Sequence, residues 1–257
     1  MEADSFRTRE SAVRKLTFVV VLRVAVAALV LSACGADVGT SHTVGIPPPS
    51  QASSEAASQQ PNASTGAPVA GDGEYEPGSY RVASGDATAV PFTFTVPAGW
   101  IGENGGQTLS KRPNEDGEVG INSYIVSDID SDSCSSGEPV PVGPLAGDLA
   151  TALMQQPSAA ASGPVDISLD SYPGHRIDLT IPADLDLASC RLGSVGLHIW
   201  EAAGGKNFVL YNGGSASVYT ADVDDGRAVL SAQWKNSSTP ADIAELDAII
   251  ESIEFGP

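Results

Sequence analysis

Two histidines, His175 and His198, are the side chains best suited to acid–base chemistry in the part of the chain that carries strand and helix patterns. Hydrolysis requires a nucleophile activated by such a base, and a third group that orients the base. The sequence contains neither a Gly-x-Ser-x-Gly elbow nor a His-Glu-x-x-His motif. We therefore expect a surface position for His175 and a sheet position for His198, and we predict that the protein is not an enzyme. A small hydrolase is the alternative.

Two acidic segments have residue types that could bind calcium. Residues 128–132 read Asp-Ile-Asp-Ser-Asp, like the start of an EF-hand loop, but Ser133 and Pro139 replace the glycine and glutamate that such a loop requires. Residues 222–226 form a second acidic run at a turn between two predicted strands. A solvated loop and a hairpin turn explain both runs, so we predict no metal site and no cofactor. Weak calcium binding remains an alternative.

Three tryptophans could line a ligand pocket. Trp100, Trp200 and Trp234 lie next to or within predicted strands. Pockets for lipids or glycans often use such rings, whereas aromatic residues on strands also fill ordinary cores. The sequence leaves both interpretations open, and a small-ligand binding module is therefore a second candidate function.

A cysteine follows an apolar segment near the start of the chain. Basic residues, among them Arg14 and Lys15, precede the segment, and it ends in Leu31-Ser32-Ala33-Cys34. This motif resembles the lipobox of bacterial lipoproteins, in which the cysteine is acylated and becomes the first residue after cleavage. The resemblance implies a signal peptide at 1–33, a lipid such as palmitate on Cys34, and a location on the extracytoplasmic face of the cell membrane.

An uncleaved membrane anchor is the alternative to this cleaved signal. Arg23 divides the apolar segment, and the uninterrupted part, residues 24–33, is shorter than the about 20 residues that span a bilayer. Arg23 near the centre of a membrane would cost about 2.5–3.5 kcal/mol. The cleaved signal is therefore favoured, and two or three acyl chains on Cys34 would hold the protein stably.

The two remaining cysteines, Cys134 and Cys190, form an even pair in an exported chain. Such pairs usually join, and we predict a disulfide between them. Closing a loop of about 56 residues would stabilise the fold by about 4 kcal/mol in the chain-entropy model. Two buried free thiols are the alternative.

The net charge limits the possible partners. The whole chain has a formal net charge of −19 at pH 7, and five of its 13 basic residues precede Cys34. Phosphates of nucleic acids and anionic lipid headgroups would be repelled by such a surface. We predict no nucleic-acid partner, contact with the membrane through the lipid on Cys34, and either an envelope protein or a small ligand as the functional partner.

The composition divides the rest of the chain into a linker and a domain. Residues 34–76 are rich in Pro, Ser, Ala and Gly and contain few bulky apolar residues. Such a segment cannot bury enough surface to offset its ordering entropy, so we expect a disordered linker. Residues 77–257 contain regular strand and helix patterns and are predicted to form the exported domain.

The domain pattern is that of an α+β fold. We predict a helix at 144–156. A second helix is predicted to begin at Pro240, with Thr239 as its N-cap. Its buried stripe consists of Ile243, Leu246, Ile249 and Ile250. We expect the strand at 92–96 to pair with 106–111, and the strands from 196 to 234 to form a meander. The predicted fold is a twisted antiparallel sheet with both helices on one face. The strands are predicted at 92–96, 106–111, 118–126, 165–169, 176–181, 196–203, 206–211, 215–221, 227–234 and 252–255.

Two short sequence segments in the domain carry a further resemblance. One segment is residues 92–100, with the sequence Phe-Thr-Phe-Thr-Val-Pro-Ala-Gly-Trp, and the other is the closing segment 246–255. Both resemble segments of exported domains in actinobacterial lipoproteins. The order of elements also looks like the α+β domains of the photosystem extrinsic PsbP type. This resemblance implies no activity and supplies no site residues. Because the sequence contains no catalytic constellation, we predict a non-catalytic binding or accessory domain. An envelope hydrolase or a calcium-binding protein would be the less favoured alternatives.

Overall fold

The computed structural model describes residues 66–86, 88–135, 137–224 and 226–256. The predicted signal peptide, Cys34 and the linker up to residue 65 lie outside these residues. Within the described ranges, no helix has the length and apolar character needed to cross a bilayer.

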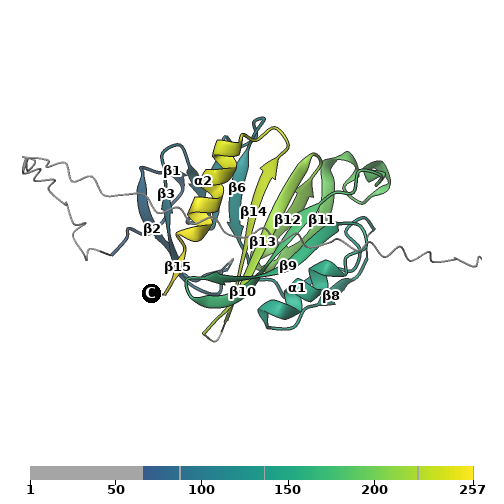
Figure 1. Cartoon of the computed structure of the whole chain (residues 1–257), viewed down its shortest axis with the longest axis horizontal. Helices are drawn as coiled ribbons and strands as arrows, with labels where there is room; N and C mark the ends of the chain where they lie inside the picture. The colour runs from purple at the N-terminus through teal and green to yellow at the C-terminus, as the bar shows by residue number, and fades with distance from the viewer. Residues whose placement is uncertain (1–65, 87, 136, 225, 257) are drawn as a thin grey trace, which may run out of the picture. The chain divides into compact units, whose positions relative to one another are not determined.

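The largest element is an eight-stranded antiparallel sheet (Figure 1). Its strands lie in the order β1-β4-β5-β6-β14-β13-β10-β9. Their bounds, in this spatial order, are Gly73–Glu74, Ile101–Glu103, Thr108–Lys111, Val119–Ser123, Gly226–Lys235, Gly214–Val223, Tyr172–Thr180 and Ala160–Leu169.

Three smaller sheets and two α-helices complete the described part of the domain. The small sheets are β15-β3-β2, β11-β12 and β7-β8. The bounds of these strands, in chain order, are β2 Gly78–Val82, β3 Phe92–Val96, β7 Asp128–Asp130, β8 Pro139–Pro141, β11 Gly196–Ala202, β12 Lys206–Tyr211 and β15 Glu254–Phe255. The helices are α1 Ala146–Met154 and α2 Pro240–Glu251, and short 3-10 turns lie at η1 Leu187–Ser189, η2 Gly193–Val195 and η3 Ala203–Gly205.

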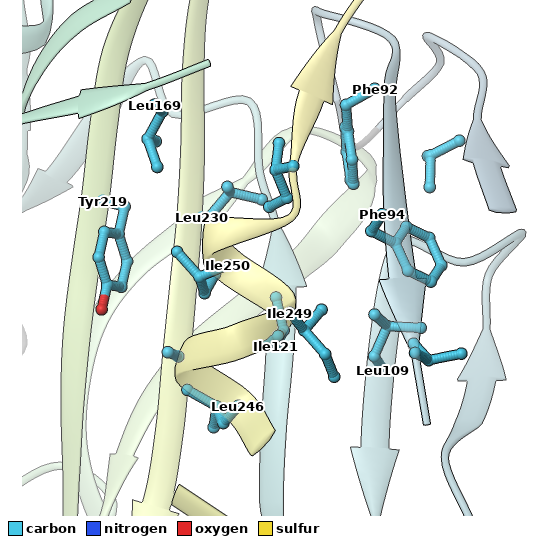
Figure 2. Packing of buried hydrophobic residues seen from close by; sticks show 14 of the residues in the cluster. Phe92, Phe94, Leu109, Ile121, Leu169, Tyr219, Leu230, Leu246, Ile249 and Ile250 are labelled. Carbon is cyan, nitrogen blue, oxygen red and sulfur yellow. The ribbon is translucent and has the colours of Figure 1, made fainter. Parts of the chain in front are cut away.

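One face of the main sheet packs against α2. Figure 2 shows Ile249 and Ile250 of this helix directed at Ile121 and Leu230 of the sheet. The β15-β3-β2 sheet closes the same cluster, to which it adds Phe94. The core on this side is therefore built from the helix stripe that the sequence predicts.

The opposite face packs against α1 and the β11-β12 hairpin. Leu149 and Leu153 of α1 join Phe208 and Leu210 of the hairpin in a second buried cluster. Side chains alternate between faces along a strand. In β13, Val218 belongs to this cluster, whereas its neighbour Tyr219 belongs to the α2 cluster. The two helices therefore cover opposite faces of the sheet.

The edge strand β9 pairs only with β10, and its register shifts at a bulge between Arg176 and Asp178 of β10. Pro164 lies in this irregular part of β9. Most of the strand is exposed. The other edge of the sheet is the two-residue strand β1.

The structure confirms the α+β class, the mainly antiparallel sheet and both helices. Three details were wrong. The helices lie on opposite faces, not on one. The strand at 92–96 is β3, and it pairs with β2 and β15 instead of with 106–111. The chain enters the main sheet only after this strand, at the buried Trp100 that precedes β4. The meander is interrupted, because the β11-β12 hairpin lies on the face of β13 and buries Phe208 there.

The start of the domain also differs from the prediction. Residues 66–76 were assigned to the linker, but β1 pairs with β4 in this segment. Ala70 and Tyr75 are only 5% and 7% exposed and belong to the α2-side core. The folded part therefore begins before residue 77, because Tyr75 provides a large apolar group in an otherwise polar sequence.

A charged cluster fixes the start of α2 to the sheet. The Thr239 hydroxyl caps the helix through the Asp242 amide, at 3.2 Å. The Asp242 carboxylate lies 3.1 Å from Lys111 and 2.5 Å from Arg112. The hydrogen bond from Thr239, and then the two basic side chains, hold the pKa of Asp242 well below its usual range. The charged carboxylate therefore stabilises the fold.

We predict that Asp242→Asn lowers the free energy of unfolding at pH 7 by about 1–3 kcal/mol, because Lys111 and Arg112 lose their anionic partner. The folded pKa is depressed, so the stabilisation is complete above about pH 5 and is lost as the pH falls further. Urea unfolding from pH 7 to pH 2 measures this. The exposed turn variant Asp116→Asn is the control, and an equal effect in both variants would contradict the prediction.

Candidate functional site

A hollow of about 200 Å³ opens on the α1 side of the main sheet, beside the β11-β12 hairpin. Helix α1 packs on β9, β10 and β13, and the hairpin covers the neighbouring strands. On this side of the sheet, β5 and β6 lie outside the area that α1 and the hairpin cover. The residues that line the hollow are Thr108, Leu109, Ser110, Glu118, Gly120, Asn122, Tyr124, Asn207, Val209, Leu210, Tyr211, Gly214, Ser215, Gln233, Trp234 and Lys235.

Strand register places neutral polar side chains on the floor of this hollow. Thr108 pairs with Asn122, while Ser110 and Gln233 both pair with Gly120. The Thr108 hydroxyl donates to Asn122 Oδ1 at 3.0 Å. At the centre, Gly120 has no side chain, and an added Cβ would lie 3.1 Å from the carbonyl oxygen of Leu109. The hollow is open because this glycine leaves the floor free.

Tyr124 is one of the lining residues, and Lys206 lies over its ring without lining the hollow itself. Lys206 Nζ donates to the carbonyl oxygens of Gln107 and Ser123, at 3.0 and 3.3 Å, and lies 5.2 Å from the Tyr124 ring centre. Burial lowers the pKa of Lys206 to about 8. Burial also raises the pKa of Tyr124, so its hydroxyl stays protonated and can donate. Lys206 thereby ties the hairpin to the edge of the hollow.

The charged groups around the hollow neutralise each other. Glu118 and Lys235 lie at one end with their charged atoms 3.0 Å apart. The remaining lining side chains are hydroxyls, amides, aromatic rings and aliphatic groups. Among the lining residues, this leaves no unpaired charge for a ligand. The neutral polar side chains can form hydrogen bonds with a ligand.

The tryptophan side chains pack in the core, and Trp234 also stands among the residues that line the hollow. Trp100 and Trp200 are both 0% exposed. Trp234 packs against the α2-side cluster, and the alternation along β14 directs its indole away from the hollow, which opens on the other face. The structure therefore favours the core interpretation of all three residues.

His198 is held in a buried network. Its ring nitrogens lie 2.8 Å from Asp130 Oδ2 and 2.8 Å from Asn207 Oδ1, and the side chain of Arg191 lies 3.8 Å from the same carboxylate. Asn207 Nδ2 donates to the carbonyl oxygen of Gly205 at 3.4 Å, which leaves Oδ1 for the histidine. Both ring nitrogens then face acceptors. Within the described residues, no hydroxyl is hydrogen-bonded to His198.

His175 lies at the surface, as predicted. Its Nδ1 is 3.1 Å from Asp166, whose side chain is 94% exposed. Among the hydrogen bonds of the described chain, none joins His175 to a hydroxyl. The structure does not bring the two histidines together in one site.

The acidic segments serve local structure. Asp130 binds His198, whereas Asp132 accepts hydrogen bonds from Ser158 and from the Cys134 amide. In the second segment, Asp222 accepts a hydrogen bond of 2.7 Å from the amide of Ala146, the first residue of α1. Asp225 lies outside the described residues. Within the described ranges, no three His, Cys, Asp or Glu side chains gather as a metal site.

The cysteine pair lies beside this network. The sulfur atoms of Cys134 and Cys190 are 2.06 Å apart, at the distance of the predicted disulfide. The Arg191 amide donates to the carbonyl oxygen of Cys134 at 2.7 Å. The disulfide joins the loop between β7 and β8 to the end of the η1 turn. Cys34 lies outside the described residues.

A second hollow, of about 390 Å³, lies on the α2 side between this helix and strands β9 and β10. Its rim contains three carboxylates, from Asp170, Asp247 and Glu251, and the guanidinium of Arg176. Arg176 is already paired with Asp178, at 3.2 Å. This surface continues the general negative charge of the protein, so the neutral hollow is the more specific candidate site.

The neutral side chains of the first hollow were not identified from the sequence. Thr108, Ser110 and Asn122 alternate with apolar residues, which is the pattern of any strand with one solvated face. The glycine at position 120 was the available signal, since an isolated glycine in a strand often marks a close approach or an open site.

Comparisons with known proteins assign no family. Neither a protein-family model nor a curated protein matches the chain. A crystal structure from Bacteroides thetaiotaomicron VPI-5482 shares 12% identity with a TM-score of 0.33, and the match covers 71% of this chain and 50% of that one. LpqN of Mycobacterium tuberculosis, described as involved in cell envelope biogenesis, shares 12% identity with a TM-score of 0.34 and coverage of 71% and 93%.

The chain thus spans half the length of the Bacteroides protein. Both TM-scores are below 0.5, so neither likeness carries a functional argument. The resemblance to lipoproteins rests on the sequence, through residues 31–34 and the two segments 92–100 and 246–255.

We predict that His198→Leu lowers the free energy of unfolding by about 3 kcal/mol, because Asp130 would stay buried without its main partner. The matched variant His175→Leu should change it by less than about 1 kcal/mol, because its hydrogen-bond partner Asp166 is exposed to solvent. Urea unfolding of both variants at pH 7 tests this. Similar losses in both variants would show that the His198 network is not a buried structural unit.

Proposed function

We propose that this chain is a lipid-anchored protein of the bacterial cell envelope whose domain binds a ligand without catalysing a reaction. The anchor is supported by the motif Leu31-Ser32-Ala33-Cys34 behind a basic and apolar leader. The linker that follows would allow the domain to act some distance from the membrane surface. A tether of this kind raises the local concentration of the domain near its partners.

The observation that carries the binding function is the hollow on the α1 side. It combines a preformed cavity with hydroxyl and amide groups that the sheet register holds in place. Binding sites commonly have this form, with a few polar groups positioned in a concave surface. Gly120 adds a second argument, because a larger residue at this position would fill the floor.

The geometry of the titratable groups supports a non-catalytic role. His198 has a carboxylate and an amide oxygen at its two nitrogens, so neither nitrogen is free to accept a proton from a nucleophile. General base catalysis requires such a free acceptor within hydrogen-bonding reach of the reacting group. The hollow itself is lined by the single charged pair Glu118–Lys235, whose members are engaged with each other.

We predict that the native protein begins at Cys34 and carries two or three acyl chains, because the motif is of the type that is lipidated before cleavage. Intact-mass analysis of protein from bacterial membranes measures both the new terminus and the added mass. Cys34→Ser should abolish the modification and leave the leader uncleaved. Native protein with an unmodified thiol, or with residues 1–33 still attached, would contradict the anchor.

Occupancy of the hollow can be tested without knowing the ligand. We predict that a photo-crosslinking p-benzoylphenylalanine in place of Tyr211, at the hollow, captures a ligand in intact cells. The same replacement of Tyr172, on the opposite face, should not. Mass spectrometry of peptides containing position 211 identifies a specific adduct. No adduct, or the same adducts at both positions, would contradict ligand binding in the hollow.

A further inference from the structure

We infer that the ligand of the hollow is an uncharged carbohydrate. This inference rests on the proposed binding function and specifies the chemistry of its ligand. It is carried by three observations: charge neutrality, complementary hydrogen-bonding groups and an exposed aromatic ring at the mouth.

Charge excludes ionic ligands from this hollow. The protein has a formal net charge of −19, so an anionic ligand would approach an unfavourable field. A cationic ligand would need an unpaired carboxylate, but the one carboxylate among the lining residues, Glu118, is paired with Lys235 at 3.0 Å. A neutral polar molecule meets neither penalty.

The hydrogen-bonding groups on the floor are complementary to sugar hydroxyls. Thr108 donates to Asn122 Oδ1, which leaves the Nδ2 donors of Asn122 available. Gln233 Nε2 donates to Ser231 Oγ at 3.1 Å, which leaves Gln233 Oε1 as an acceptor. Within the described chain, no other hydrogen bond engages the Asn122 amide, whereas Gln233 is also hydrogen-bonded to Tyr124. A donor and an acceptor on neighbouring strands match two adjacent hydroxyls, each of which can donate and accept.

An aromatic ring provides the apolar contact. Tyr211 is 52% exposed and lies at the hollow, near Tyr124. A sugar ring has an apolar face of C–H groups that packs on an aromatic ring while its hydroxyls stay at the edge. Exposed tyrosines suit this role, because they offer a large contact area at low entropic cost.

The test uses the full chain in a zwitterionic detergent, since detergents with sugar headgroups would compete. Isothermal titration calorimetry is performed with cellohexaose, laminarihexaose and maltohexaose. Trigalacturonic acid and the uncharged peptide acetyl-Ser-Gly-Ser-Gly-amide are the competing ligand classes. We expect binding of at least one neutral sugar, and a tenfold or greater loss of affinity in Asn122→Leu and in Tyr211→Ala.

Matched controls separate the site from the fold. Gln155→Leu on the exposed end of α1, and Tyr172→Ala on the opposite face, should bind like the unmodified protein. Thr108→Val is nearly isosteric and removes the bond that orients the Asn122 amide, so it should weaken binding about threefold to tenfold even if Asn122→Leu does not fold.

The inference is overturned if none of the three neutral sugars binds, if their binding is unaffected by the site variants, or if only the acid or the peptide binds. Specific capture at position 211 together with any of these results would refute the carbohydrate and retain the binding function. Absence of both capture and sugar binding would refute the binding function itself.

Discussion

The pairing of β13 with β14 is the constraint on which the rest of the domain depends. These strands pair over ten consecutive positions, from Gly214–Lys235 to Val223–Gly226. Both faces of the pair are buried, one against α2 and the other against α1 and the β11-β12 hairpin. Their register fixes which side chains enter each cluster, because a shift by one residue would exchange the two faces.

The hollow exists because packed elements cover more of one face of the main sheet than of the other. On the α2 side, the helix and the β15-β3-β2 sheet reach β5 and β6 and bury Leu109 and Ile121. On the other side the cover ends at the hairpin, so Thr108 and Asn122 stay accessible on the reverse of the same strands. Lys206 marks this limit, because its ammonium group binds main-chain oxygens at the start of β5 and the end of β6.

Features encoded by neighbouring residues could be predicted, and features that depend on distant contacts could not. The alternation of Phe92–Val96 and the capping sequence Thr239-Pro240 identified their elements correctly. The sheet to which β3 belongs depends on β2 and β15, which lie at opposite ends of the described chain. The hollow depends on which parts of the sheet have no helix or hairpin packed on them. The alternation of a polar residue with apolar neighbours is the same whether that residue lines a hollow or lies on an ordinary solvent-facing surface. The lipidation motif lies outside the described residues, so the anchor stays a prediction.

The irregular edge strand has a consequence for crowded surroundings. A long exposed strand usually presents a continuous ladder of amide and carbonyl groups that can join a second molecule. In β9, the bulge opposite Arg176 and Asp178 breaks the spacing, and Pro164 removes one amide hydrogen. At the other margin, β1 is only two residues long. Among the described strands, the two edges of the main sheet therefore offer neighbouring copies a poor template for fibril-like stacking, even where many molecules share a small surface.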